Sequence, residues 1–476
     1  MKNKFLSVRW AILFLFFSLY GHSQTVMTLK ECIETGLNNN FNVLQKELDA
    51  KSARANWKQS RMNIFPDLNA SAGHSFNQGR SIDPYTNSPV TQSFNSSNYS
   101  VNSNVILFNG LAIQNGIKQN SLRYQASAME LQQQKDELTI NIILAYLDVL
   151  NNNDQLEQVR YRMDLSAKQV ERLEILNKEG ATRPIIFTDL KGQYAGDQVA
   201  IINAQNALEA SKMILSQLMN VPYNKDLTLE KIDAGLFATK YENGPATIYQ
   251  TAVKQLALIK AVDLRQQSAA KGVKVERGRL LPTLSFGVGV STRYSSVALQ
   301  NQYINTVYAP TSDSAIVNNV KYPVYRFRDN FSTPTKISYM DQLNNNVYTS
   351  FGFNLNIPIF NSLAQRNRVK QAKIEFERAE LVSKNTRTEL SRNIDMAYIN
   401  MVSASERYKV LLEQVNAYSA SFRSAEVLFQ QGVGTSIDYL IAKRNLDNAN
   451  IDLIVAKYDL VLRTKILDFY QGKQLW

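Results

Sequence analysis

The sequence is poor in the side chains on which most enzyme chemistry depends. Only two of its 476 residues are His and one is Cys. These residues are His22, His74 and Cys32. Metal sites built from His and Cys, disulfide frameworks and Ser-His-Asp or Cys-His constellations need more such residues. The sequence therefore predicts a protein that is not an enzyme, with no catalytic residues, no metal and no cofactor.

The sequence also lacks an apolar run of the roughly 18 residues that a transmembrane helix needs. An apolar run at 10–20 follows three basic residues and precedes a Gly-His-Ser site. This arrangement is typical of a secretory signal peptide. We therefore expect 1–23 to be a signal peptide and the mature chain to be exported. Cys32 lies away from the cleavage site, so we expect no lipid anchor.

Charge of one sign is not concentrated anywhere in the chain. The 53 Lys and Arg residues exceed the 41 Asp and Glu residues, giving a formal net charge of +12. The basic residues are interspersed with acids along helical stretches such as KQVERLEILNKEG. Such mixing is typical of solvated helix faces. In an exported chain it predicts no nucleic-acid partner.

An internal duplication is visible in the sequence. LFNGLAIQNGIKQ at 107–119 matches IFNSLAQRNRVKQ at 359–371 at seven of thirteen positions, an offset of 252. Upstream, 53–68 aligns with 269–284 at an offset of 216. Repeats of this size are too large for a solenoid unit. They predict two copies of one structural unit.

Long helices dominate both copies. Apolar side chains recur at alternating steps of four and three from Leu138 to Leu173 and from Leu390 to Phe429. A sustained period of 3.5 residues is typical of coiled-coil packing. The helix predicted from Ala112 to Lys178 would be roughly 100 Å long at a rise of about 1.5 Å per residue. A rod of that length predicts an elongated chain.

Segments with a period of two residues precede the long helices. Alternation of apolar with small or polar residues occurs at 68–76, 101–107, 284–290 and 349–357. It indicates strands, either of a soluble antiparallel sheet with one buried face or of a membrane β-barrel with a polar lumen. Gly, Ser and Asn on the polar faces favour the barrel. Four strands cannot close a barrel and an open edge is forbidden in lipid, so a barrel requires oligomerisation.

This order of elements resembles the TolC-type outer-membrane efflux proteins, or outer membrane factors. The shared features are the export leader, the duplicated helix-Pro-strand-strand-helix unit, the junctions Phe108-Asn109-Gly110 and Phe360-Asn361-Ser362, and two Gly-containing hairpin tips. Together they cover nearly all of the mature chain. The resemblance implies a mostly α fold with a membrane β-barrel. Each protomer would give four strands to a trimeric 12-stranded barrel, and its long helices would form an α-barrel.

The resemblance also implies a function. The chain would be the outer-membrane channel, or exit duct, of a tripartite efflux pump or type I secretion system. It would be a passive conduit for small molecules or proteins, set in the bacterial outer membrane with a long periplasmic extension. The implied partners are two further copies in a homotrimer, a periplasmic adaptor (membrane fusion) protein, an inner-membrane RND or ABC transporter and outer-membrane lipid. A non-channel periplasmic or surface coiled-coil scaffold is the alternative, but it does not explain the alternation in all four strands.

The same patterns give approximate boundaries. Repeat 1, at 24–240, would contain strands at about 67–76 and 100–108, an α-hairpin at about 112–220 and a linker at 221–240. Repeat 2, at 241–476, would contain strands at about 283–291 and 347–359 and an α-hairpin at about 363–470. The stretches Asn77–Tyr99 and Thr292–Asn346 would be external loops, as long external connections are usual in membrane barrels.

Two sets of candidate functional residues follow. The polar strand positions are candidates for the barrel lumen: Asn69, Ser71, Ser75, Asn102, Asn104, Ser285, Ser350 and Asn354. The turns between the long helices, where the resemblance implies a periplasmic gate and adaptor contacts, supply Gly180, Thr182, Arg183, Asp189, Gly432, Gly434, Thr435 and Asp438.

Helix capping is the simpler interpretation of most residues in these turns. Asp189 and Asp438, interpreted as matched carboxylates near Arg183 and Thr435, are the candidates for gate polarity. Pro184 and Ser436 depart from the gate pattern of the family, which puts an Arg-Asp lock in doubt.

Overall fold

The computed structural model describes residues 26–83, 87–91, 93–232, 243–473 and 475. The expected signal peptide and residues 233–240 of the expected linker lie outside the described residues. The described chain forms two units. Unit 1 holds the residues up to Asn56, 119–269 and those from Ile374 onward, and unit 2 holds 57–118 and 270–373.

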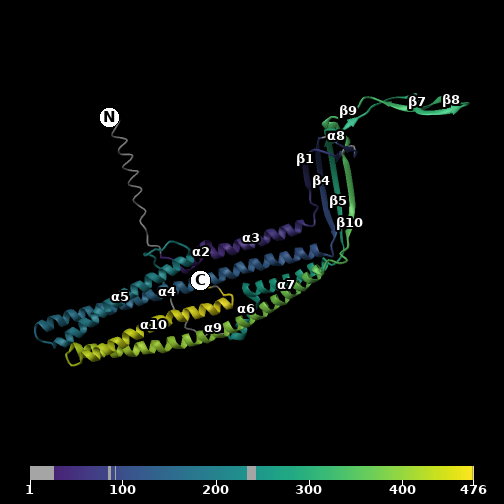
Figure 1. Cartoon of the computed structure of the whole chain (residues 1–476). Coiled ribbons are helices and arrows are strands. Elements are labelled where there is room, and N and C mark those ends of the chain that lie inside the picture. The colour runs from purple at the N-terminus through teal and green to yellow at the C-terminus, as the bar shows by residue number, and fades with distance from the viewer. Residues whose placement is uncertain (1–25, 84–86, 92, 233–242, 474, 476) are drawn as a thin grey trace, which may run out of the picture. The chain divides into compact units, whose positions relative to one another are not determined.

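Unit 1 is built from helices, and its longest members form two hairpins. In one hairpin α4 (Ala112–Lys178) turns into α5 (Pro184–Met219), and in the other α9 (Ala364–Gln430) turns into α10 (Ser436–Tyr470). Both turns lie at the same end of the unit (Figure 1). Helices α4 and α9 each have 67 residues, and both begin in unit 2.

Shorter helices precede the strands in each repeat. They are α2 (Leu29–Asn39), α3 (Phe41–Met62), α6 (Pro245–Gln255) and α7 (Ala257–Gly278). The start of α6 lies 216 residues after that of α2, and the same offset separates α7 from α3. In unit 1, α7 is tied to α4 by Arg265 and Glu130, and to α9 by Asp263 and Arg387. The duplication therefore extends to helix lengths, with two helices rather than one before the first strand.

The cores of unit 1 lie along the long helices. Ile142, Tyr146 and Leu215 are fully buried in the largest cluster. The hydroxyl of Tyr146 donates to the carbonyl of Glu230, which ties α4 to the segment after α5. A second cluster joins α6 and α9 through Ile248 and Ile394. Ile142 of α4 and Ile394 of α9 lie on the 3.5-residue pattern of the sequence, which explains why these helices pack along one stripe.

Unit 2 contains a four-stranded antiparallel sheet. Its order is β1 (Asn69–Asn77), β4 (Phe94–Phe108), β5 (Thr283–Ser295) and β10 (Tyr348–Asn356). The central pairing of β4 with β5 joins the two repeats. Strand β4 begins six residues before the expected start at 100, and β5 ends four residues after the expected end at 291. The paired region is therefore longer than the alternation in the sequence indicates.

The Phe-Asn-(Gly/Ser)-Leu junctions start the long helices with a left-handed turn. Gly110 and Leu111 both have positive φ, at 65° and 63°, and so do Ser362 and Leu363, at 54° and 62°. In unit 2 the Gly110 turn lies against the backbone of Gly278, so closely that a Cβ on Gly110 would be 2.2 Å from the Gly278 oxygen. Only glycine fits such an approach at positive φ.

The segment expected as the second external loop carries secondary structure of its own. A long ribbon is formed by β7 (Tyr303–Val317) and β8 (Val320–Phe331), and it extends beyond the sheet within unit 2 (Figure 1). The short strands β6 (Leu299–Gln300) and β9 (Thr335–Lys336) and helix α8 (Tyr339–Asn345) complete it. The first loop holds β2 (Ser81–Ile82) and β3 (Pro89–Val90). Among the described helices, none has both the length and the apolarity to cross a bilayer.

Candidate functional site

One face of the sheet gathers all eight residues that the sequence nominates for a lumen. Register pairs Asn69 with Asn102 and Ser71 with Ser100 between β1 and β4. It then pairs Asn102 with Gly289, and Gly289 with Ser350, across β5 and β10. Side chains alternate between the faces of a strand, so the following share one face: Asn69, Ser71, Ser75, Asn102, Asn104, Ser285, Ser350 and Asn354.

Most side chains on this polar face are small as well as hydrophilic. The hydroxyls of Ser71 and Ser100 lie 2.8 Å apart, and the amide of Asn102 donates to Ser100 at 3.1 Å. Glycines take several of the positions between them, and a Cβ on Gly289 would lie 2.7 Å from the Asn102 oxygen. The middle of the face therefore carries small hydrogen-bonding groups, whereas Arg293 and Tyr348 share the face towards one end of the sheet and Ile106 towards the other.

The opposite face of the sheet is apolar and exposed in the single chain. Phe351 is 79% exposed and Phe353 is 70% exposed, and the Phe353 ring lies 5.0 Å from that of Phe286. His74 also lies on this face, where its Nδ1 is 2.9 Å from the Ser97 hydroxyl. Apolar side chains exposed over a whole sheet face mark a surface that something else covers.

The two hairpin turns of unit 1 have the same design. Gly180 and Gly432 follow α4 and α9 with φ of 69° and 75°. After each glycine a backbone amide bonds back to the helix, from Ala181 to Leu176 and from Val433 to Leu428. These are the bonds of a glycine C-cap. The turns are thus built to end one long helix and start the next.

The residues after these glycines play different parts in the two turns. Thr435 caps α10: its hydroxyl accepts from the Asp438 amide at 3.1 Å and donates to the Asp438 carboxylate at 2.6 Å. Arg183 occupies the cap position of α5 without a side-chain bond, and Pro184 opens that helix. Thr182 and Gly434 occupy the equivalent positions just before them.

The structure corrects the pairing of Asp189 with Asp438. Asp438 is the third residue of α10 and belongs to its cap, whereas Asp189 is the sixth residue of α5. At the offset of 252 that relates the hairpins, Asp189 corresponds to Ile441 rather than Asp438. Asp189 is exposed, and within the described part of the chain it takes part in no ion pair. The two carboxylates therefore occupy non-equivalent positions.

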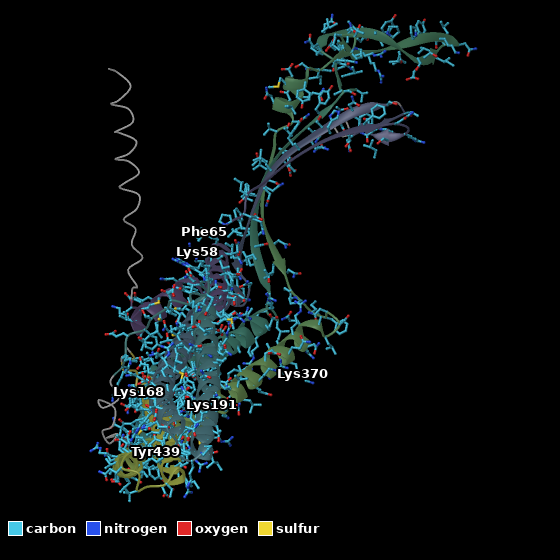
Figure 2. All side chains as sticks on the ribbon, turned by 90° about the vertical axis from the view of Figure 1, so that its left-hand side faces the viewer. Lys58, Phe65, Lys168, Lys191, Lys370 and Tyr439 are labelled. Carbon is cyan, nitrogen blue, oxygen red and sulfur yellow. The ribbon has the colours of Figure 1, made fainter. Side chains whose placement is uncertain are left out.

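An apolar cluster joins the two hairpins behind the turns. Leu190 of α5 and Tyr439 of α10 are each 1% exposed, and the Tyr439 ring stacks on Phe429 at 4.9 Å. Figure 2 shows Tyr439 near the turns. Arg172 of α4 donates to the carbonyl of Gln430 at the end of α9 at 2.9 Å. The cluster, which we call the tip cluster, holds repeat 1 against repeat 2.

A buried group of four charges lies next to the tip cluster along the same helices. We define the charge network as Arg162, Asp197, Lys443 and Asp447, contributed by α4, α5 and α10. The Asp197 side chain is 0% exposed and lies 3.0 Å from Arg162 Nε and 3.6 Å from Lys443 Nζ. Lys443 is 3.3 Å from Asp447. The network is neutral in sum, and its Asp197–Lys443 contact crosses between the repeats.

Neutral groups complete the surroundings of Asp197. Ser166 donates its hydroxyl to one carboxylate oxygen, and the Gln193 amide donates to the other at 3.0 Å. Arg162 Nε is close to Asp197 but its N–H is not aimed at an acceptor, so this contact is purely an ion pair. Burial raises the pKa of Asp447 in spite of the nearby Lys443 and Arg162 charges. The network opens into a pocket of about 430 Å³.

The sequence carried a signal for this network. Asp197 follows Leu190 by seven residues and precedes Ala204 by seven, which is a core position of the heptad pattern in α5. Lys443 follows the buried Tyr439 by four residues in α10. Charged residues at core positions are rarely buried unless they are paired. The partners, however, come from helices far apart in the chain, and only the fold identifies them.

A second set of charges joins the repeats further along α4. The Asp154 carboxylate accepts from the Tyr458 hydroxyl at 2.7 Å and from Lys457 at 3.1 Å. Lys231 lies 3.4 Å from the same carboxylate. Burial raises the pKa of Asp154, but the Tyr458 and Lys457 bonds and the two lysine charges outweigh it, so the pKa is lowered.

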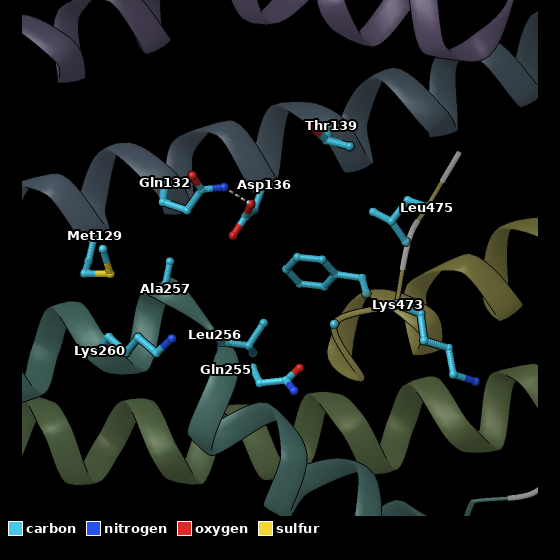
Figure 3. Close-up of a pocket in the computed structure, with 12 residues that line it drawn as sticks. Met129, Gln132, Asp136, Thr139, Gln255, Leu256, Ala257, Lys260, Lys473 and Leu475 are labelled. Carbon is cyan, nitrogen blue, oxygen red and sulfur yellow. Dashed lines mark hydrogen bonds between the residues drawn. The ribbon is translucent and has the colours of Figure 1, made fainter.

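A pocket of about 370 Å³ in unit 1 lies between α4, the break from α6 to α7 and the turn after α10 (Figure 3). The amide of Gln132 donates to Asp136 at 2.7 Å, and burial raises the pKa of Asp136. Lys260 and Lys473 also line the pocket. These groups include no nucleophile paired with a base. Among the described residues, no three His, Cys, Asp or Glu side chains are grouped to hold a metal.

A family model and a curated relative agree on the family that this chain resembles. The model of the family described as outer membrane efflux protein matches 32–221 and 248–472. A curated relative, the outer membrane protein TolC of Vibrio cholerae serotype O1, is 23% identical over 328 residues. That alignment covers 68% of this chain and 65% of the relative, so the matched region spans less than two thirds of that protein.

Solved structures of outer membrane proteins share the fold. The structure of VceC from Vibrio cholerae aligns with a TM-score of 0.73 at 14% identity, covering 94% of this chain and 97% of VceC. The open state of the Neisseria gonorrhoeae MtrE outer membrane channel aligns with a TM-score of 0.71 at 15% identity, covering 94% and 89%. At these identities the likeness is one of fold.

Proposed function

Because the chain belongs to the outer membrane efflux protein family, we propose that it is the exit duct of a tripartite efflux pump or of a type I secretion system. Membership places the protein in the outer membrane, as the sequence predicted, in a family of channels. It also confirms the predicted fold class of long helices with a few antiparallel strands. The duct, its copy number and its partners are the proposal.

The observation that carries the proposal is the two-faced sheet with two open edges. One face collects the eight polar and small residues, and the other exposes Phe351 and Phe353. Strands β1 and β10 are the edges of the sheet. In lipid, each unpaired N–H or C=O group at such an edge costs roughly several kcal/mol. Other copies must therefore pair with both edges.

Three copies satisfy this requirement. When β10 of one copy pairs with β1 of the next, three four-stranded sheets make twelve strands, within the range of membrane barrels. The polar face then lines the lumen and the apolar face meets lipid. A soluble scaffold, the alternative, would leave the phenylalanines of the second face in water. The two-faced sheet thus favours the channel.

The helical hairpins are the proposed gate. The tip cluster and the charge network hold α5 of repeat 1 against α10 of repeat 2 through Tyr439 and the Asp197–Lys443 contact. Separation of the hairpins would break this contact and widen the passage between neighbouring copies. The turns at Gly180 and Gly432 are where a periplasmic adaptor would dock. Behind the adaptor an inner-membrane RND or ABC transporter would supply substrate and energy.

Planar-bilayer conductance of the purified trimer tests the duct. We expect discrete channels from the wild type. Asp189 and Asp438 are exposed near the turns although they are not equivalent, so we also propose that the Asp189→Ala/Asp438→Ala variant has a larger conductance without loss of the trimer. Unchanged conductance in that variant would remove these carboxylates from the gate. Absence of any channel from an intact trimer, with the adaptor present as well, would refute the proposed function.

A further inference from the structure

The β7–β8 ribbon of unit 2 has two chemically different faces. Tyr308 pairs with Phe327, and Pro310 pairs with Tyr325. The Tyr308 ring lies 5.1 Å from Phe327 and stacks on Tyr325 at 5.4 Å. We call this the aromatic face. Its rings are open to solvent in the single chain, with Phe327 at 76% and Tyr308 at 63% exposure.

The other face of the ribbon carries arginines. Arg328 pairs with Val307 and Arg326 pairs with Ala309, which are the positions between those of the aromatic face. Side chains alternate along a strand, so Arg326 and Arg328 stand on the face opposite Phe327. Asp329 lies on the aromatic side, where Thr306 bonds it at 2.6 Å. In the described chain neither arginine takes part in an ion pair. We call this the arginine face.

A ribbon of this kind is not stable by itself. Two-stranded hairpins are marginal in water unless a third element covers one face. Both faces of the ribbon are largely exposed within unit 2, and β8 is exposed at all twelve of its positions. Something outside the single chain must therefore cover it. Guanidinium groups stack favourably on aromatic rings, so the two faces of the ribbon complement each other.

We propose that the ribbon docks on the ribbon of a neighbouring copy, with the aromatic face of one against the arginine face of the next. The inference rests on the proposed trimer, in which every interface is head to tail. Such an interface joins two different surfaces of the same chain, and the ribbon offers two. A twelve-stranded barrel is roughly 25 Å across and a strand of fifteen residues is roughly 50 Å long, so neighbouring ribbons can reach each other.

The contact is too small to create the trimer. The exposed parts of Tyr308, Tyr325 and Phe327 amount to roughly 400 Å², whereas an independent interface needs about 1,000 Å² or more. The barrel must bring the ribbons together, and the ribbons then close over its outer mouth. Loss of the ribbon contact should therefore leave the barrel trimeric.

Cross-linking between two differently tagged chains tests the pairing of faces. One chain carries Pro310→Cys on the aromatic face and the other carries Val307→Cys on the arginine face. Burial raises the pKa of the natural Cys32 thiol to about 12, and its side chain is fully buried, so it does not react with a maleimide. In co-expressed trimers a short bis-maleimide should link the two tags. The Pro310→Cys chain by itself should give no dimer.

Charge reversal supplies the second arm. Arg326→Glu with Arg328→Glu should abolish the cross-link, whereas Lys336→Glu in β9, outside the ribbon, should leave it intact. A dimer from Pro310→Cys chains would show aromatic faces packed on each other and overturn the head-to-tail contact. No cross-link in a barrel that native mass spectrometry shows to be trimeric means that a different partner covers the ribbon, which overturns the inference. A barrel that is not trimeric refutes the proposed function instead.

Discussion

Removing the charge of Asp197 tests the role of the charge network. In Asp197→Asn the side chain keeps its size and its acceptor for Gln193, but Arg162 and Lys443 then share only Asp447. Loss of one partner from a buried ion pair typically costs about 3–5 kcal/mol. Arg162 is 17% exposed and the network opens into a pocket, so water screens part of the charge. We therefore expect a loss of about 3 kcal/mol in the free energy of unfolding.

A second substitution identifies the cause of that loss. Asp197→Asn combined with Lys443→Met removes one charge of each sign and leaves Arg162 with Asp447. The double variant should regain about 1.5 kcal/mol or more relative to the single variant, which is the coupling expected for charges in one network. Asp164→Asn is the control, because its pair with Lys168 on α4 (Figure 2) is exposed and should contribute nothing measurable.

Chemical denaturation of the detergent-solubilised protein, followed by circular dichroism of the helices, measures these differences. Bilayer recordings of the same variants show whether the Asp197–Lys443 contact also holds the hairpins closed. If it does, Asp197→Asn and the double variant should conduct more than the wild type. Additive effects of Asp197→Asn and Lys443→Met would refute the coupling. If Asp197→Asn were as stable as the control, the charge of Asp197 would contribute no measurable stability in spite of its burial.

Three further predictions concern the described helices and junctions. Asp154→Asn should destabilise the protein at neutral pH. The pKa of Asp154 is lowered in the folded protein, so its ionised form contributes stability above the ordinary Asp pKa, and this contribution is lost as the pH falls through the folded pKa. The thermal unfolding of variant and wild type should therefore converge below about pH 4. A constant difference at all pH values would contradict this. Asp136→Asn should stabilise the protein at neutral pH. Burial raises the pKa of Asp136, so the stability that its protonated form contributes is lost as the pH rises. The variant should melt at a higher temperature than the wild type at neutral pH and show no gain below about pH 4. Gly110→Ala should cost about 2 kcal/mol or more, since it combines a left-handed backbone with a clash against Gly278. Gly116→Ala, in open space inside α4, should gain about 0.5–1 kcal/mol, and equal melting temperatures for the two variants would exclude the close approach as the reason for Gly110.

Much of the architecture is decided by local patterns in the sequence. The 3.5-residue period of α4 and α9 specifies long packed helices because each apolar stripe must be covered along its whole length. The two-residue period of the strands decides which side chains share a face, since alternation is a property of the backbone itself. Asn69 and Asn354 therefore fall on the same face, although they lie on opposite edge strands.

Other features depend on which distant segments meet. The charge network needs Arg162, Asp197 and Lys443 from three helices, and no local pattern pairs them. The non-equivalence of Asp189 and Asp438 arises because the two turns start their helices differently, one with Pro184 and the other with a Thr435 cap. The alternation of side chains at 303–331 is too irregular for the sequence to predict the ribbon, because the register of its two strands shifts near Asn305 and Ser314.

The sequence by itself thus determined the duplication, the long helices, the two-faced strands and the scarcity of catalytic side chains, all of which depend on residue type and spacing. Only the tertiary structure decided which charges are buried together and which aromatic rings lie exposed side by side on the ribbon. The physical reason is that burial and ion pairing are properties of contacts between segments. Such contacts form only when the chain has folded.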